Sequence, residues 1–125
     1  MSQIRCFTDL KVWAKAHQLV LEIYEITKNF PAEEKYALSQ QLRRAAVSIG
    51  SNIVEGFKKH SKKDSLHFYN ISAASLEEAK YQLLIARDLT YIEQIKYTNI
   101  IKLCNEVGIM LNAWINSNRQ RYLKS

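Results

Sequence analysis

Apolar residues recur every three to four positions along almost the whole chain, with polar residues on the opposite faces of the same segments. This pattern predicts four amphipathic helices, covering about residues 8–29, 31–57, 62–89 and 93–116. Phe30-Pro31 marks the first boundary, because a proline pushes the residue before it out of the α region. Thr8 or Asp9 provides a side-chain oxygen that can cap the first helix.

Short connections between long helices place consecutive helices antiparallel to one another. We therefore expect an all-α fold, an up-down-up-down antiparallel four-helix bundle, formed by a single domain of residues 1–116 and followed by a short basic tail, 117–125. The three Gly and one Pro are too few for a β-sandwich or barrel of this length. Ser61 followed by Asp64 resembles a capping box at the start of the third helix.

The location of the protein follows from what the sequence lacks. No apolar run approaches the ~20 residues of a membrane span, and the N-terminus does not have the layout of a signal peptide. The two cysteines, Cys6 and Cys104, do not make a disulfide framework. We expect a reduced, cytoplasmic protein with no membrane partner.

One narrow arc of the second helix is polar, directly beside its apolar stripe. The arc consists of Gln41, Arg44, Ser48, Asn52 and Glu55. We interpret it as a structural polar network, in which Lys80 and Arg87 of the third helix supply the charge opposite Glu55. A ligand or nucleic-acid site is the alternative, but a carboxylate within the set would repel phosphate.

The second helix also has a second apolar side, which one bundle core does not explain. It consists of Arg43, Val47, Gly50, Val54 and Phe57. We expect an oligomer interface there, with cover by a neighbouring loop as the alternative. Gly50 weakens the helix by about 1 kcal/mol relative to alanine, which suggests a bend or the close approach of another backbone.

The charge of the chain favours an anionic partner. There are 18 Lys+Arg against 12 Asp+Glu, for a formal net charge of +6. Four cations of the run between the second and third helices form a compact candidate site for phosphates, to which three cations of the tail can add. These hypothetical nucleic-acid-binding residues are Lys58, Lys59, Lys62, Lys63, Arg119, Arg121 and Lys124. The alternative is a solvated loop without a partner.

Catalysis has little support in the sequence. The histidines, His17, His60 and His67, belong to neither an HExxH nor a Glu-x-x-His pattern, so no metal site is expected. Neither cysteine has a histidine at motif spacing, and no glycine-rich loop is present to hold a phosphate. We expect a protein that is not an enzyme and that carries no cofactor.

Several stretches together resemble a known family. They are residues 7–16, Phe30-Pro31, 41–49, 51–57 and 75–78, and 41–57 is the most specific of them. The chain resembles, from about Phe7 to Trp114, the bacterial four-helix-bundle family named for the intervening sequences of 23S ribosomal RNA genes. A related accessory protein of diversity-generating retroelements is a pentamer with a basic surface that binds nucleic acid and a reverse transcriptase. The family resemblance implies fold and assembly more firmly than function.

The chain departs from this family at three positions. Gly50 stands where proline is common, Val54 where alanine is usual, and Thr90 where glycine usually ends the third helix. These departures affect local geometry and leave the fold pattern intact. We expect a non-catalytic homo-oligomer, a pentamer by analogy, that binds RNA or DNA through its basic surface. A protein-interaction scaffold with no nucleic-acid role is the alternative.

Overall fold

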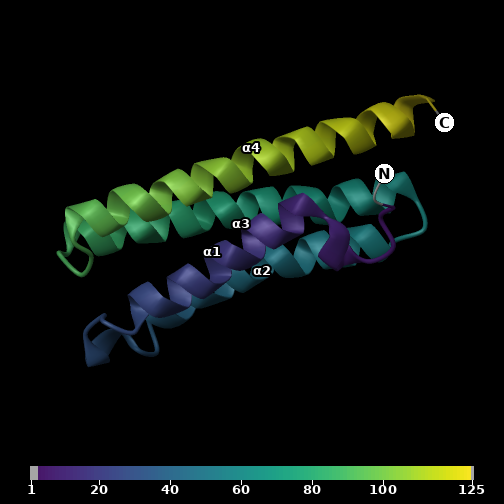
Figure 1. Cartoon of the computed structure of the whole chain (residues 1–125). Helices are drawn as coiled ribbons and strands as arrows, with labels where there is room; N and C mark the ends of the chain where they lie inside the picture. Colours follow the sequence, from purple (N-terminus) through teal and green to yellow (C-terminus); the bar gives the residue numbers. More distant parts are fainter. Residues whose placement is uncertain (1–2, 125) are drawn as a thin grey trace.

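The computed structural model describes the backbone of residues 3–124 and the side chains of residues 3–123. In chain order the elements are η1 (Phe7–Asp9), α1 (Lys11–Thr27), η2 (Ala32–Glu34), α2 (Leu38–Lys58), α3 (Lys62–Asp88) and α4 (Gln94–Lys124). The four long helices run up, down, up and down, and the described residues contain no strand (Figure 1). The predicted all-α bundle is confirmed.

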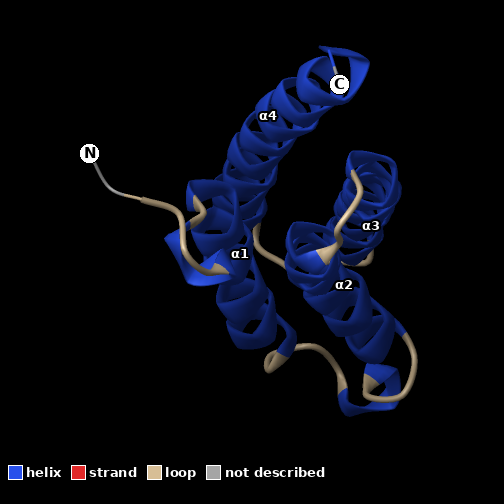
Figure 2. Ribbon diagram, turned by 90° about the vertical axis from the view of Figure 1, so that its right-hand side faces the viewer, coloured by secondary structure: helices blue, strands red, loops and turns tan. Residues whose placement is uncertain are grey.

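Each helix of the bundle packs against two neighbours. Helix α1 contacts α2 and α4, whereas α3 contacts α2 and α4 from the other side, as Figure 2 shows along the helices. The predicted apolar stripes meet in one core. Its fully buried side chains include Leu19, Ile23, Leu42, Ile49, Ile53, Tyr69, Leu83, Val107 and Leu111. No helix in the described part of the chain has the length and apolar character needed to cross a membrane.

The first helix begins later than predicted, because Asp9 caps a separate short turn. Its carboxylate Oδ2 accepts the N–H groups of Arg5 (2.9 Å) and Cys6 (3.1 Å), and these bonds lower the pKa of Asp9. The 3-10 turn η1 follows, and α1 starts after Leu10 without a side-chain cap. The expectation that Thr8 or Asp9 caps the first long helix was therefore wrong.

The second helix does not begin at Pro31 as expected. The residues after Pro31 form only the 3-10 turn η2, and α2 starts at Leu38. The hydroxyl of Tyr91, from the turn between α3 and α4, donates to Glu34 Oε2 at 2.8 Å, which raises the pKa of Tyr91. The Tyr91 ring also packs against Phe30, with 5.5 Å between centroids. These contacts join residues far apart in the sequence, so local sequence patterns do not predict them.

Helix α3 starts and ends near the expected residues. Ser61 Oγ accepts the N–H of Asp64 at 3.1 Å, as expected of the N-cap. At the other end Thr90 adopts a left-handed conformation, with φ 63°. The N–H of Tyr91 returns to Ala86 O at 2.8 Å, the bond of a Schellman motif. Thr90 therefore ends α3 in a conformation that glycine adopts easily and that β-branched residues disfavour.

Helix α4 continues to Lys124, so the predicted end at residue 116 and the separate tail were wrong. Asn118 is buried, with 1% of its surface exposed. Its side-chain amide donates to Trp114 O at 2.7 Å, and its Oδ1 accepts Lys62 Nζ of α3 at 3.3 Å. The polar composition of 117–124 did not predict a helix, because the buried residue that holds this segment in place is an asparagine rather than an apolar side chain.

The close approach of two helices occurs at Gly56 rather than at Gly50. A Cβ atom on Gly56 would lie 2.5 Å from Tyr69 Cε1 and 3.0 Å from Ser65 O, so α2 and α3 pack at a separation that only glycine allows. A Cβ atom on Gly50 would have nothing within 4 Å. Small residues continue this contact, since Ser72 Oγ donates to Ile49 O at 2.7 Å.

Candidate nucleic-acid interface

The basic segments of the sequence meet at one end of the bundle. The connection between α2 and α3 and the last turns of α4 both lie at the end marked by N and C in Figure 1. Residues 55–64 and 117–123 together contribute six Lys and Arg side chains but only two carboxylates, those of Glu55 and Asp64. The extension of α4 produces this convergence, because it carries Arg119 and Arg121 on a helix instead of a tail.

A cleft of about 240 Å³ lies between the two basic segments. Lys59, His60, Lys62 and Arg121 line it, and Tyr69 and Trp114 are also among its lining residues. Lys62 is held in position by its bond to the buried Asn118. Cations from three helix ends therefore surround one concave surface.

Two of the cations have protein partners. Lys59 Nζ lies 3.8 Å from Glu55 Oε2 and 4.8 Å from the centre of the Phe68 ring. An exposed pair of this kind contributes ~0–1 kcal/mol, so an incoming phosphate can compete with it. Lys62 has its hydrogen bond to Asn118.

The other predicted binding residues point to solvent. Lys58, Lys63, Arg119 and Arg121 are exposed, and within residues 3–123 none of them forms an ion pair. Tyr122 is 43% exposed. The backbone of Lys124 belongs to α4, but its side chain lies outside the described residues. The described part of this end therefore offers several cations whose charge no carboxylate neutralises.

The polar arc of α2 forms a smaller network than expected. Ser48 Oγ lies 2.7 Å from Ser75 Oγ of α3, and Asn52 Nδ2 donates to Ser48 O at 2.8 Å. Gln41, Arg44 and Glu55 are exposed. The side chain of Glu55 is 59% exposed and pairs with Lys59, so the expectation that it is buried and paired across the bundle was wrong.

The register of α2 against α3 explains why Lys80 and Arg87 do not reach Glu55. Because the two helices are antiparallel, Gly56 faces Tyr69 and Ser48 faces Ser75. Lys80 and Arg87 lie further along α3, away from the end of α2 that carries Glu55. Lys80 instead pairs with Glu77 at 3.1 Å, and Arg87 with Asp88 at 3.0 Å. Helix periodicity gave the correct face but not the register along the axis.

The second side of α2 forms an apolar groove together with α1. The groove has a volume of about 260 Å³, and Val47, Gly50 and Val54 line it from α2. Trp13, His17 and Val20 line it from α1. Val47 is 41% exposed, and the Trp13 and His17 rings stack with 4.9 Å between centroids. Sequence reasoning missed this contribution of α1, although the broad apolar arc of that helix is its signal.

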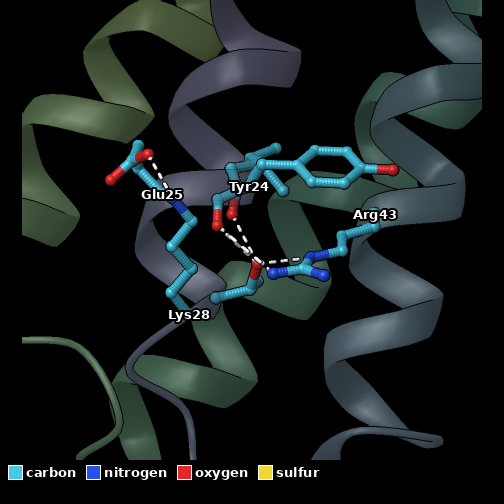
Figure 3. Close-up of polar contacts among 6 residues, drawn as sticks. Tyr24, Glu25, Lys28 and Arg43 are labelled. Atoms are coloured by element: carbon cyan, nitrogen blue, oxygen red, sulfur yellow. Dashed lines mark hydrogen bonds and ion pairs between the residues drawn. The ribbon is translucent and has the colours of Figure 1, made fainter.

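Arg43 and Phe57 do not belong to the groove. Arg43 Nε donates to Thr27 Oγ1 at 2.7 Å, and its guanidinium lies beneath the Tyr24 ring, 4.6 Å from the centroid (Figure 3). Phe57 is half-buried against the core and lines the basic cleft. Of the residues predicted to form the oligomer interface, Val47, Gly50 and Val54 line the groove.

The two free thiols lie in different environments, Cys104 in the core and Cys6 on the surface. Burial raises the pKa of the Cys104 thiol to about 12, which keeps it neutral at physiological pH. Cys6 is exposed beside Thr8 and Asp9. No group of three or more His, Cys, Asp or Glu side chains within residues 3–123 is arranged to hold a metal ion.

Comparison with known proteins identifies the family of this chain. Residues 8–113 match the family described as 23S rRNA-intervening sequence protein. A crystal structure of a protein of unknown function from the S23 ribosomal protein family of Bacteroides thetaiotaomicron is similar, with a TM-score of 0.78. The two are 27% identical, over 84% of this chain and 95% of the other. No curated protein sequence matches. The chain belongs to the 23S rRNA-intervening sequence protein family.

Proposed function

We propose that this protein is a non-catalytic homo-oligomer that binds RNA or DNA through the basic end of its bundle. The observation that carries this function is the convergence of the α2–α3 connection and the end of α4 around one cleft. Exposed cations without ion-pair partners attract phosphates, and binding releases the counterions that surround a nucleic acid.

The expected binding is weak and largely independent of base sequence. Flexible, exposed lysines contact phosphates, which carry no sequence information, whereas base reading needs fixed side chains in a groove. Glu55 and Asp64 are too few to cancel the six cations nearby. Binding by one chain alone offers few contacts, so several basic ends in one assembly would strengthen it.

Self-association is the second part of the function that we propose. The groove between α1 and α2 leaves Val47 41% exposed and Val54 half-buried. A second copy of the chain would cover this surface. The pentamer is the number of subunits suggested by the resemblance to the retroelement accessory protein.

Fluorescence anisotropy at several salt concentrations tests the basic end. Removing two phosphate contacts should flatten the log–log salt dependence on duplex DNA by about two units. Lys58→Ala/Lys63→Ala on the α2–α3 connection and Arg119→Ala/Arg121→Ala on α4 should each produce this change. All four side chains are exposed, so the fold should tolerate both replacements.

Lys96→Ala/Lys102→Ala is the matched control. It removes the same charge from exposed positions of α4 away from the basic end. An unchanged slope in both test variants, or the same change in the control, would contradict the proposed surface. Absence of binding even at low salt would leave the protein-interaction scaffold as the better function.

A further inference from the structure

A third concave surface lies between α1 and the first half of α2, next to the apolar groove, with which it shares Val47. It encloses about 660 Å³, a volume typical of small-molecule sites. Its lining includes Tyr24, Lys35, Tyr36, Arg43 and Arg44, and no Asp or Glu side chain lines it. We call it the tyrosine–arginine hollow. Three cations and two aromatic rings in one hollow need an explanation that the basic end does not provide.

Arg43 is fixed in the hollow by α1. Its Nε donates to Thr27 Oγ1 at 2.7 Å and its Nη2 to Tyr24 O at 3.3 Å, while the Tyr24 ring covers one face of the guanidinium (Figure 3). A guanidinium has five N–H donors, so three have no protein partner among the described residues. An already positioned guanidinium loses little side-chain entropy when it binds an anion.

Arg44 and Lys35 add positive charge to the hollow, and neither forms an ion pair with a described carboxylate. Arg44 is exposed, and within residues 3–123 it has neither an ion pair nor a hydrogen bond from its side chain. Within the described residues Lys35 Nζ has no ion pair, and it lies 5.4 Å from the centroid of the Tyr36 ring. Neither Glu25, which pairs with Lys28, nor Glu34, which accepts a hydrogen bond from Tyr91, lines the hollow. The hollow therefore favours an anion.

The aromatic rings specify which anion fits. Tyr36 lines the hollow and is 79% exposed, so most of its ring surface is available to a ligand. An exposed ring provides a stacking face for a planar group, and base–aromatic stacking contributes ~1–3 kcal/mol. A simple inorganic anion or an acidic peptide would use the cations and leave this ring without a role.

We propose that the tyrosine–arginine hollow binds a nucleotide unit, with its phosphate at Arg43, Arg44 and Lys35 and its base stacked on Tyr36. The unit is either a free nucleotide or one residue of a single-stranded nucleic acid, because both present the same phosphate and base. This site does not depend on phosphate binding at the basic end, which lies at the opposite end of α2.

Isothermal titration with adenosine 5′-monophosphate tests the site, with adenosine and inorganic phosphate as partial ligands. The monophosphate should bind more tightly than either part. Arg44→Ala should weaken binding about tenfold or more, the usual cost of a charge-assisted hydrogen bond. Tyr36→Leu should weaken it about fivefold or more through lost stacking, whereas Tyr36→Phe should retain it.

Lys102→Ala is the matched control, because it removes one positive charge from an exposed position of α4 that does not line the hollow. An equal loss in this control and in Arg44→Ala would overturn the site, as would inorganic phosphate binding as tightly as the nucleotide. No binding of the monophosphate at millimolar concentration would overturn it as well.

Two further measurements identify the source of the nucleotide and distinguish binding at the hollow from binding at the basic end. Displacement of the monophosphate by a short single-stranded RNA would indicate a unit of a strand, and its absence a free nucleotide. The Lys58→Ala/Lys63→Ala variant should bind the monophosphate normally. Loss of binding in that variant would show that the nucleotide occupies the basic end and would overturn the assignment to the hollow.

Discussion

The two sides of α2 differ in how completely they are packed. Toward α3 the helix is closed, because Gly56 allows direct contact with Tyr69 and Ser72 donates to the backbone of Ile49. Toward the outside it is open, because Gly50 leaves space at the bottom of a groove whose rim includes the exposed Val47. The same residue type has opposite consequences on the two sides. One glycine completes a contact inside the chain, and the other leaves room for one outside it.

The largest effect should come from placing a charge in the open side. If a second copy covers the groove, Val54→Glu would bury an unpaired carboxylate at a cost of ~3–5 kcal/mol per contact. Light scattering should then show a smaller particle, while circular dichroism shows unchanged helicity. Ile109→Glu is the control, because Ile109 is a 72% exposed apolar residue on α4. A wild-type protein that is already a 14.6 kDa monomer at micromolar concentration would remove the assembly from consideration.

An intermediate effect should come from overfilling the closed side. Gly56→Ala brings a methyl group to 2.5 Å from the Tyr69 ring, so we expect a loss of ~1–3 kcal/mol in the free energy of unfolding. Chemical denaturation measures it, and faster modification of the buried Cys104 in a Cys6→Ser background provides a second readout.

Gly50→Ala is the matched control for this change. Its methyl group meets nothing within 4 Å, and alanine favours the helix by about 1 kcal/mol. We therefore expect the chain to become more stable. Destabilisation by Gly50→Ala as large as that of Gly56→Ala would show that the two sides do not differ in packing.

The smallest effect should come from the polar arc at the edge of the closed side. Asn52 is half-buried and, among the described residues, its side chain bonds only to Ser48 of the same helix, so Asn52→Ala should cost no more than about 1 kcal/mol. Glu55→Gln removes an exposed ion pair and should change the thermal midpoint even less. A loss of several kcal/mol in either variant, measured by thermal unfolding, would mean that the arc is buried by a partner.

Much of the fold was predictable from the sequence because helix faces are a local property. The stripe of Leu42, Ile49 and Ile53 is buried as predicted, and Ser61 caps α3. The register was not predictable, since it depends on where Gly56 meets Tyr69. For the same reason we predicted that Glu55 pairs with Lys80 and Arg87, whereas it pairs with Lys59.

The candidate sites were predictable only in part. The basic run and the residues 119 and 121 were identified, but their convergence depends on Asn118, whose buried contacts extend α4. The tyrosine–arginine hollow was missed because it combines α1, the connection before α2, and α2. Its residues carry no common spacing, and Arg43 was assigned instead to an apolar side that it does not share.

The unequal ends of the bundle have a consequence for symmetry. Residues 28–37 and 88–95, at the end opposite the basic cleft, carry four carboxylates and two lysines. A closed ring whose rotation axis runs along the bundle would place every basic cleft on one rim and these carboxylate-rich connections on the other. A dimer with a two-fold axis across the bundle would point its basic ends in opposite directions. A cyclic arrangement would therefore give the particle one face suited to a polyanion, whereas a dihedral arrangement would give it two.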